Sequence, residues 1–233
     1  MRTRGWKRWL VIAPVAIMIM VVGGTWVFIN VIQDEAPERL TLADATSAAS
    51  AGTDSSDAGT DPGGTWNIAE GSTVGYRVQE VLFGQTSVAV GRTQEVTGSM
   101  TVRDTTVETA EFTVDMASVR SDESRRDDQF NGRTMETGTY PVATFQLTKP
   151  VDLGAIPTEG EDVTFNATGD LMLHGVTRSV TVELTGRWTG STVQVAGSIP
   201  ITFADYDIDD PSFAGVISTE DDGTLEFSRN LEP

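Results

Sequence analysis

Few residues in this sequence could perform chemistry. The chain has one histidine, His174, and no cysteine, which excludes thiol nucleophiles, thiol redox chemistry and disulfides. A serine hydrolase would need an activated serine, but there is no Gly-x-Ser-x-Gly elbow and no carboxylate that spacing assigns as a partner. His174 is followed by Gly175, a pair typical of a hairpin turn. We therefore predict a structural histidine and no enzymatic activity, with a hydrolase built on His174 as a minority alternative.

An acidic run at residues 205–210 resembles the opening of a calcium-binding loop. Its sixth position is aspartate instead of glycine, and its twelfth is Val216 instead of glutamate, so it does not fit an EF-hand. A structural zinc site would need about four cysteine or histidine ligands, which the chain lacks. We predict a solvated acidic loop, no metal site and no cofactor.

Arg125 and Arg126 could bind a phosphate group, because guanidinium groups match phosphate oxygens. The adjacent Asp127 and Asp128 make local ion pairs the favoured interpretation. The whole chain carries 16 Lys and Arg against 34 Asp and Glu, a formal net charge of -18. Nucleic-acid-binding proteins present a basic face, so nucleic acid is excluded as an expected partner.

Residues 9–32 contain no charged side chain, and a helix of that length, at about 1.5 Å per residue, would cross a hydrocarbon core roughly 30 Å thick. The preceding residues 1–8 are basic and acidic residues follow, which predicts a cytoplasmic N-terminus. We expect a single-pass protein of the cell membrane with its domain outside the cytoplasm. A cleaved signal peptide is the alternative, but its apolar region would be shorter.

Residues 33–64 are dominated by alanine, serine, threonine, aspartate and glycine. Such a composition offers too little apolar surface to offset the entropy of ordering it, which predicts a flexible, disordered linker. The remaining residues, 65–233, are expected to form one domain.

Apolar residues recur at every second position of that domain, as in Val74–Val78, Phe112–Met116 and Val180–Leu184. This period is typical of β-strands. Turn residues separate the runs, as successive antiparallel strands require. We predict an all-β domain of about eight to ten strands, with a turn or two of helix within 122–137.

An antiparallel sheet of this size forms either a sandwich or a closed barrel, and a closed barrel can hold one small ligand. The large side chains at inward positions suit an adaptable apolar pocket, although most such stripes simply fill a core. The residues expected to line the interior are Tyr76, Val78, Met100, Phe112, Val114, Met116, Phe145, Leu171, Leu173, Val182 and Phe203.

Several segments, in order along the domain, resemble the YceI-like family of polyisoprenoid-binding, lipocalin-like barrels. They are the runs TWNI at 65–68, STVGYRV at 72–78, VTGSM at 96–100, SRRD at 124–127, YPVATF at 140–145, GDLMLHGVTR at 169–178 and IPITF at 199–203. Many family members have a His-Ser pair where this chain has Gly71-Ser72, and a histidine where it has Glu80.

The resemblance implies a closed antiparallel barrel of about eight strands whose apolar interior holds an isoprenoid lipid, of the polyprenyl phosphate or quinone type. No enzymatic step is implied. The alternative from another class is a structural or adhesive envelope domain whose core is filled by its own side chains.

Overall fold

The computed structural model describes residues 36–42, 62–82, 85–212 and 217–233. Within these residues the chain forms a sheet of twelve strands with several short helical segments. In chain order the elements are β1 (Gly64–Ile68), β2 (Thr73–Leu82), β3 (Gln85–Thr93), β4 (Val96–Arg103), β5 (Thr106–Asp115), η3 (Met116–Ser118), α3 (Ser124–Gln129), η4 (Phe130–Thr134), β6 (Val142–Leu147), β7 (Val151–Asp152), β8 (Asp162–Leu173), β9 (Val176–Trp188), β10 (Val193–Thr202), η5 (Phe203–Tyr206), β11 (Ile217–Thr219) and β12 (Asp222–Glu232).

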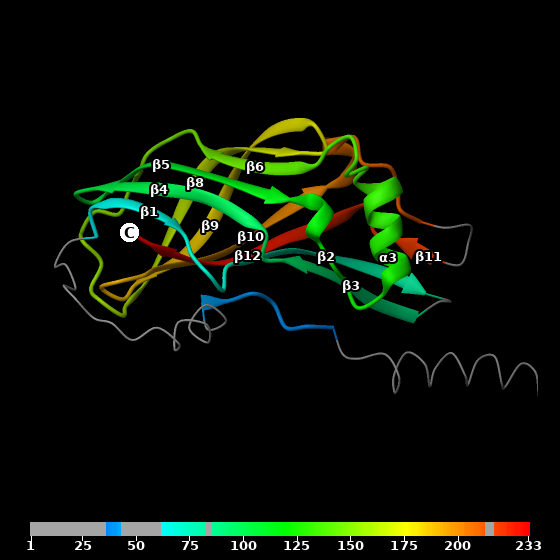
Figure 1. The fold of residues 1–233 in the computed structure, drawn as a ribbon, viewed down its shortest axis with the longest axis horizontal. Helices are drawn as coiled ribbons and strands as arrows, with labels where there is room; N and C mark the ends of the chain where they lie inside the picture. Colours follow the sequence, from blue (N-terminus) through cyan, green and yellow to red (C-terminus); the bar gives the residue numbers. More distant parts are fainter. Residues whose placement is uncertain (1–35, 43–61, 83–84, 213–216) are drawn as a thin grey trace, which may run out of the picture.

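The sheet closes on itself to form a barrel (Figure 1). Its strands follow the order β1-β4-β5-β6-β8-β9-β10-β12, and β12 then pairs with β1 through Asn67 and Glu232. Every neighbouring pair in this ring is antiparallel. Closure removes the exposed strand edges that an open sheet would present. The predicted closed antiparallel barrel of about eight strands is therefore confirmed.

The last strand, β12, is shared between two parts of the wall. It pairs with β10 along its length, with β2 over Thr224–Ser228, and with β1 only at its end. β3 continues the wall from β2, and Arg92 of β3 exchanges two backbone hydrogen bonds with Arg120, at 2.8 and 2.9 Å. The hairpin β2–β3 thus fills the wall between β12 and the chain that follows β5.

Local sequence explains the strands and their turns. The strands alternate apolar and polar residues, which places one set of side chains inside the barrel and the other outside. β8 and β9 are joined by His174 and Gly175, both with positive φ (50° and 76°), as in a tight two-residue hairpin. A side chain at Gly175 would meet the Tyr140 ring at 2.6 Å. The hairpin turn predicted at this pair is confirmed.

A short helical segment covers one end of the barrel. α3 and η4 lie beside the ends of β2 and β11 in Figure 1, at what we call the α3 end. Phe130 stacks on Tyr76 with ring centroids 5.1 Å apart, and Met135 is buried. The turn or two of helix predicted within 122–137 is present as α3 and η4. At the opposite end the interior contains Trp66 and Trp188.

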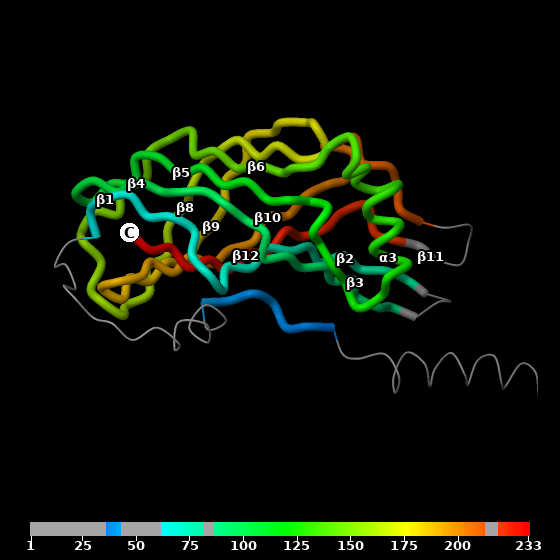
Figure 2. Tube along the Cα trace, in the orientation of Figure 1, coloured from blue at the N-terminus to red at the C-terminus, as the bar shows by residue number. Residues whose placement is uncertain are grey.

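Residues 36–42, within the predicted flexible linker, lie along the outside of the barrel (Figure 2). The backbone oxygen of Pro37 accepts a hydrogen bond from Arg77, and that of Thr41 accepts one from Ser228 at 2.8 Å. Leu42 is buried. We call residues 36–42 the docked segment. The prediction that residues 33–64 form a flexible, disordered linker is therefore wrong for this part, and residues 33–35 and 43–61 lie outside the described residues.

The predicted basic segment 1–8 and membrane span 9–32 also lie outside the described residues. In the part of the chain that the structure describes, no helix is long and apolar enough to cross a membrane.

Candidate functional site

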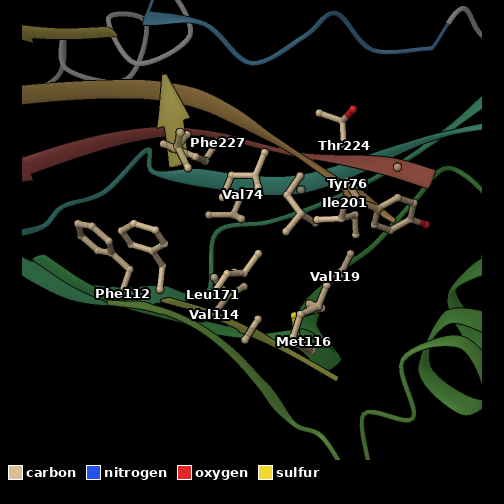
Figure 3. A pocket seen from close by; sticks show the side chains of 18 of the residues that line it. Val74, Tyr76, Phe112, Val114, Met116, Val119, Leu171, Ile201, Thr224 and Phe227 are labelled. Atoms are coloured by element: carbon tan, nitrogen blue, oxygen red, sulfur yellow. The ribbon is translucent and has the colours of Figure 1, made fainter. Parts of the chain in front are cut away.

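The barrel encloses an elongated cavity of about 220 Å³. Its walls come from the strands of the ring other than β1, from β2 and β3, and from the α3–η4 segment. Figure 3 shows side chains from two opposing walls pointing into it, with Val74, Ile201 and Phe227 facing Phe112 and Val114. Most of the lining residues are aliphatic or aromatic. A site of this kind can hold an apolar chain but offers few groups that could assist a reaction.

The structure places every residue predicted for the interior on the wall of this one cavity. Those on strands come together because each occupies the inward parity of its strand, whereas Met116 and Phe203 lie in η3 and η5, directly after β5 and β10. Leu171 and Leu173 of β8 alternate inward, as do Phe112 and Val114 of β5. Their contact with a ligand stays a prediction.

Sequence reasoning missed the contribution of β12. Leu225, Phe227, Arg229 and Leu231 line the cavity at alternate positions of this strand. An arginine occupies one of these inward positions and interrupts the apolar alternation that identified the other strands. The alternation of large residues from 225 to 231 was the available signal.

The charged residues on the described part of the cavity wall are Glu80, Arg126 and Arg229. Arg126 lies 3.8 Å from Glu80 and also pairs with Asp122, so its ion-pair partners are not the adjacent Asp127 and Asp128 that the sequence suggested. Burial raises the pKa of Glu80 above its ordinary value of 4.5, while Arg126 acts in the opposite direction. Burial also raises the pKa of the Tyr76 hydroxyl. These groups form a polar cluster at the α3 end.

Arg229 is separate from that cluster. Its guanidinium carbon lies 4.4 Å from the centroid of the Phe112 ring and 5.2 Å from that of Phe227. Its side chain has no carboxylate within 4.0 Å among the described residues, and its Nη1 atom has no hydrogen-bond partner. Burial lowers its pKa to about 10. An unpaired cation therefore lies among the apolar side chains of the cavity, apart from the polar cluster at the α3 end.

His174 is buried at the β8–β9 turn and does not line the cavity. Its Nδ1 lies 3.1 Å from the backbone oxygen of Tyr206, and the edge of its ring packs against Tyr140. Its Nε2 lies 3.3 Å from a carboxylate oxygen of Glu136, without the geometry of a hydrogen bond. These contacts fix the turn against η5 and support the predicted structural role.

The acidic loop at 205–210 makes local contacts. The backbone oxygen of Asp205 accepts a hydrogen bond from Arg178, and the Asp210 carboxylate accepts one from the Ser212 backbone. The Ser212 hydrogen bonds hold the pKa of Asp210 below its ordinary value. Among the described residues, no group of three or more histidine, aspartate or glutamate side chains is placed to hold a metal ion.

Comparison with known proteins identifies the fold. A model of the YceI-like domain family matches residues 66–231, which is nearly the whole barrel. The chain belongs to this family. The resemblance inferred from the sequence segments is thus confirmed.

Two UPF0312 proteins of Vibrio are similar to this YceI-like chain over 102 residues. The protein of Vibrio parahaemolyticus is 35% identical and that of Vibrio campbellii 34%, in each case covering 41% of this chain and 50% of the relative. The match therefore spans about half the length of these relatives.

Two solved structures share the fold. A polyisoprenoid-binding domain from Saccharophagus degradans, implicated in plant cell wall breakdown, superposes with a TM-score of 0.60 at 22% identity, covering 72% of this chain and 97% of that one. BcnA from Burkholderia cenocepacia superposes with a TM-score of 0.54 at 22% identity, covering 68% and 95%. At these identities the similarity shows a common YceI-like barrel.

Proposed function

We propose that this YceI-like barrel binds an isoprenoid lipid in its interior, on the extracytoplasmic side of a membrane to which residues 9–32 anchor it. The observation that carries the proposal is the apolar cavity inside the closed barrel, which spans both core clusters. The domain from Saccharophagus degradans, described as polyisoprenoid-binding, shares this fold and supports the same ligand class.

The energetics suit binding without catalysis. Burial of apolar surface contributes about 25 cal/mol per Å², so a flexible hydrocarbon chain within the cavity gains affinity along its whole length. The cavity wall is built mainly from side chains such as Val114, Phe145 and Leu171, which offer contact area and no reactive group. Polyprenyl phosphates and quinones both carry such a chain.

Extraction of the purified chain with organic solvent, followed by mass spectrometry, tests the proposal. We expect a prenyl lipid in stoichiometric amount. A chain that is purified without lipid, and that takes up none from a mixture of prenyl lipids, would contradict the proposal and favour a structural envelope domain.

A cavity-filling substitution separates retention of lipid from folding. Ala143 lies on the cavity wall with its neighbour on β5, Val114. Ala143→Phe adds apolar volume inside the barrel and should reduce retained lipid several-fold, at a cost in stability of about 1–3 kcal/mol. Ala155→Phe makes the same change at an exposed loop position and should leave retention unchanged. Equal lipid content in both variants would contradict the proposed site.

A further inference from the structure

Arg229 occupies an inward position of β12, between two parts of the apolar interior. Phe227, two residues before it, packs against the cluster at the α3 end, whereas Leu231 and Phe112 belong to the opposite cluster. Only 7% of Arg229 is exposed, and it lines the cavity. The arginine therefore projects into the ligand chamber and has no route to the outer surface of the barrel.

No acidic group of the described chain neutralises this arginine. Glu226 precedes it on the same strand but has the opposite parity, and pairs with Arg77 and Arg92. Glu80 is the carboxylate on the cavity wall. Thr73 pairs with Ser228, so at about 3.3 Å per residue the strand from Thr73 to Glu80 places that carboxylate roughly 23 Å further along β2.

A buried charge without a counterion is costly, because the low-dielectric interior does not replace its hydration. The rings of Phe112 and Phe227 attract the guanidinium, but a cation–π contact returns only part of the lost hydration. The Nη1 atom is left without an acceptor. A ligand that brings an anion to this position would supply both the countercharge and the missing hydrogen bonds.

We propose that Arg229 binds the acidic headgroup, phosphate or carboxylate, of the ligand, and that this headgroup lies in the middle of the barrel instead of at the α3 end. The inference rests on the proposed lipid-binding function and narrows it to anionic amphiphiles. A guanidinium group takes phosphate or carboxylate oxygens in a bidentate geometry, which neutral prenyl alcohols and quinones do not provide.

Paired lipids that share a tail and differ in headgroup test the inference. The full chain, in octyl glucoside micelles, is given an equimolar mixture of geranylgeranyl phosphate and geranylgeraniol, or of oleate and oleyl alcohol. Native mass spectrometry measures the ratio of acid to alcohol bound. We expect the native chain to favour the acid in at least one pair, and the pair that shows this preference distinguishes a phosphate from a carboxylate ligand.

Arg229→Met keeps an unbranched apolar side chain and removes the charge. Its ratio of acid to alcohol should fall by roughly 10- to 100-fold relative to the native chain, the range for a hydrogen-bonded charge pair, while the alcohol is still bound. Partition into micelles is common to both proteins and cancels from this comparison. Arg229→Lys should restore part of the preference. Arg103→Met, the same change at an exposed residue on the outside, should have no effect.

Three results would overturn the inference. The first is that the native chain binds both members of every pair equally. The second is that Arg229→Met keeps the preference for the acid. The third is that Arg126→Met, at the α3 end, removes this preference while Arg229→Met does not. In each case lipid is bound and the proposed function stands. If no lipid binds to the native chain, the proposed function fails and this inference fails with it. Circular dichroism and thermal unfolding confirm that each variant is folded. If Arg229→Met does not fold, the ratio of acid to alcohol bound by Arg229→Lys is compared with that of the native chain instead.

Discussion

At the residue scale, the outer face of β12 contains a buried ion cluster. Glu226 is only 1% exposed, and its Oε1 lies 3.3 Å from Arg77 Nη2 and 3.6 Å from Arg92 Nη2. Its other carboxylate oxygen, Oε2, accepts a hydrogen bond from the backbone of Leu40 at 3.4 Å. One carboxylate therefore joins β12, β2, β3 and the docked segment.

Glu226→Gln should lower the free energy of unfolding by about 3 kcal/mol, because it leaves two partly buried arginines without their countercharge. Urea unfolding at neutral pH measures the change. Glu108→Gln is a matched control, since Glu108 pairs with Arg103 at 3.2 Å in an exposed position and should contribute less than about 1 kcal/mol. If both variants lose the same small amount, Glu226 is not a structural anchor.

Glu80 makes the stability of the barrel depend on pH. Its pKa is raised by burial, so the folded state binds a proton more tightly than the unfolded chain. The stabilising contribution is complete below pH 4.5, the ordinary pKa of the group, and is lost as the pH rises through the folded-state pKa.

Glu80→Gln mimics the protonated form at every pH. The variant should therefore gain thermal stability over the native chain at pH 7, and that gain should shrink towards pH 4. Melting curves of both proteins across this range check the prediction. A gain that is constant with pH, or one that grows as the pH falls, would show that ionised Glu80 is not disfavoured in the folded state.

At the scale of elements, the docked segment acts as a strap across the β12–β2–β3 surface. It is held by Arg77, Arg92 and Ser228, which donate to the backbone oxygens of Pro37, Glu38 and Thr41. Leu42 is buried at its end. The segment lacks a regular element of its own over 36–41, so its order comes from these tertiary contacts.

A truncated chain beginning at residue 43 should be less stable than one beginning at residue 36, because it loses the hydrogen bonds to Arg77, Arg92 and Ser228 and the burial of Leu42. Chemical unfolding of the two truncated chains measures the difference. Equal stabilities would mean that the docked segment does not support the barrel.

The strap also shows what local sequence could not predict. Strand positions followed from alternation, because each strand's pattern is local and one parity must face the core. Residues 36–42 are too few to show a helix or strand period, and their binding surface is made by Arg77, Arg92 and Ser228, far away in sequence. Arg229 was missed for a related reason, since a charged residue in an inward position contradicts the apolar rule that identifies a barrel interior.

At the scale of the whole molecule, the docked segment sets how the barrel would stand on a membrane. In the proposed topology the span ends at residue 32 and the docked segment begins at residue 36. An extended chain covers at most about 3.6 Å per residue, so residues 33–35 could separate the barrel from the bilayer surface by no more than about 15 Å. The long polar stretch at 43–61 follows the docked segment and would not lengthen this distance.

We therefore predict that deleting residues 45–58 leaves the distance between barrel and membrane unchanged. The chain has no cysteine, so Ile156→Cys on the exposed surface provides a single site for a donor dye. Energy transfer to rhodamine-labelled lipid in phosphatidylcholine vesicles reports the distance. Ten glycine and serine residues inserted between residues 35 and 36 are the control, and should lower the transfer because they lengthen the tether between the span and the docked segment.

If the deletion raises the transfer, residues 43–61 are the true tether and the docked segment releases the barrel. If the full chain does not associate with vesicles, or a chain beginning at residue 36 associates equally well, the proposed anchor at 9–32 is wrong.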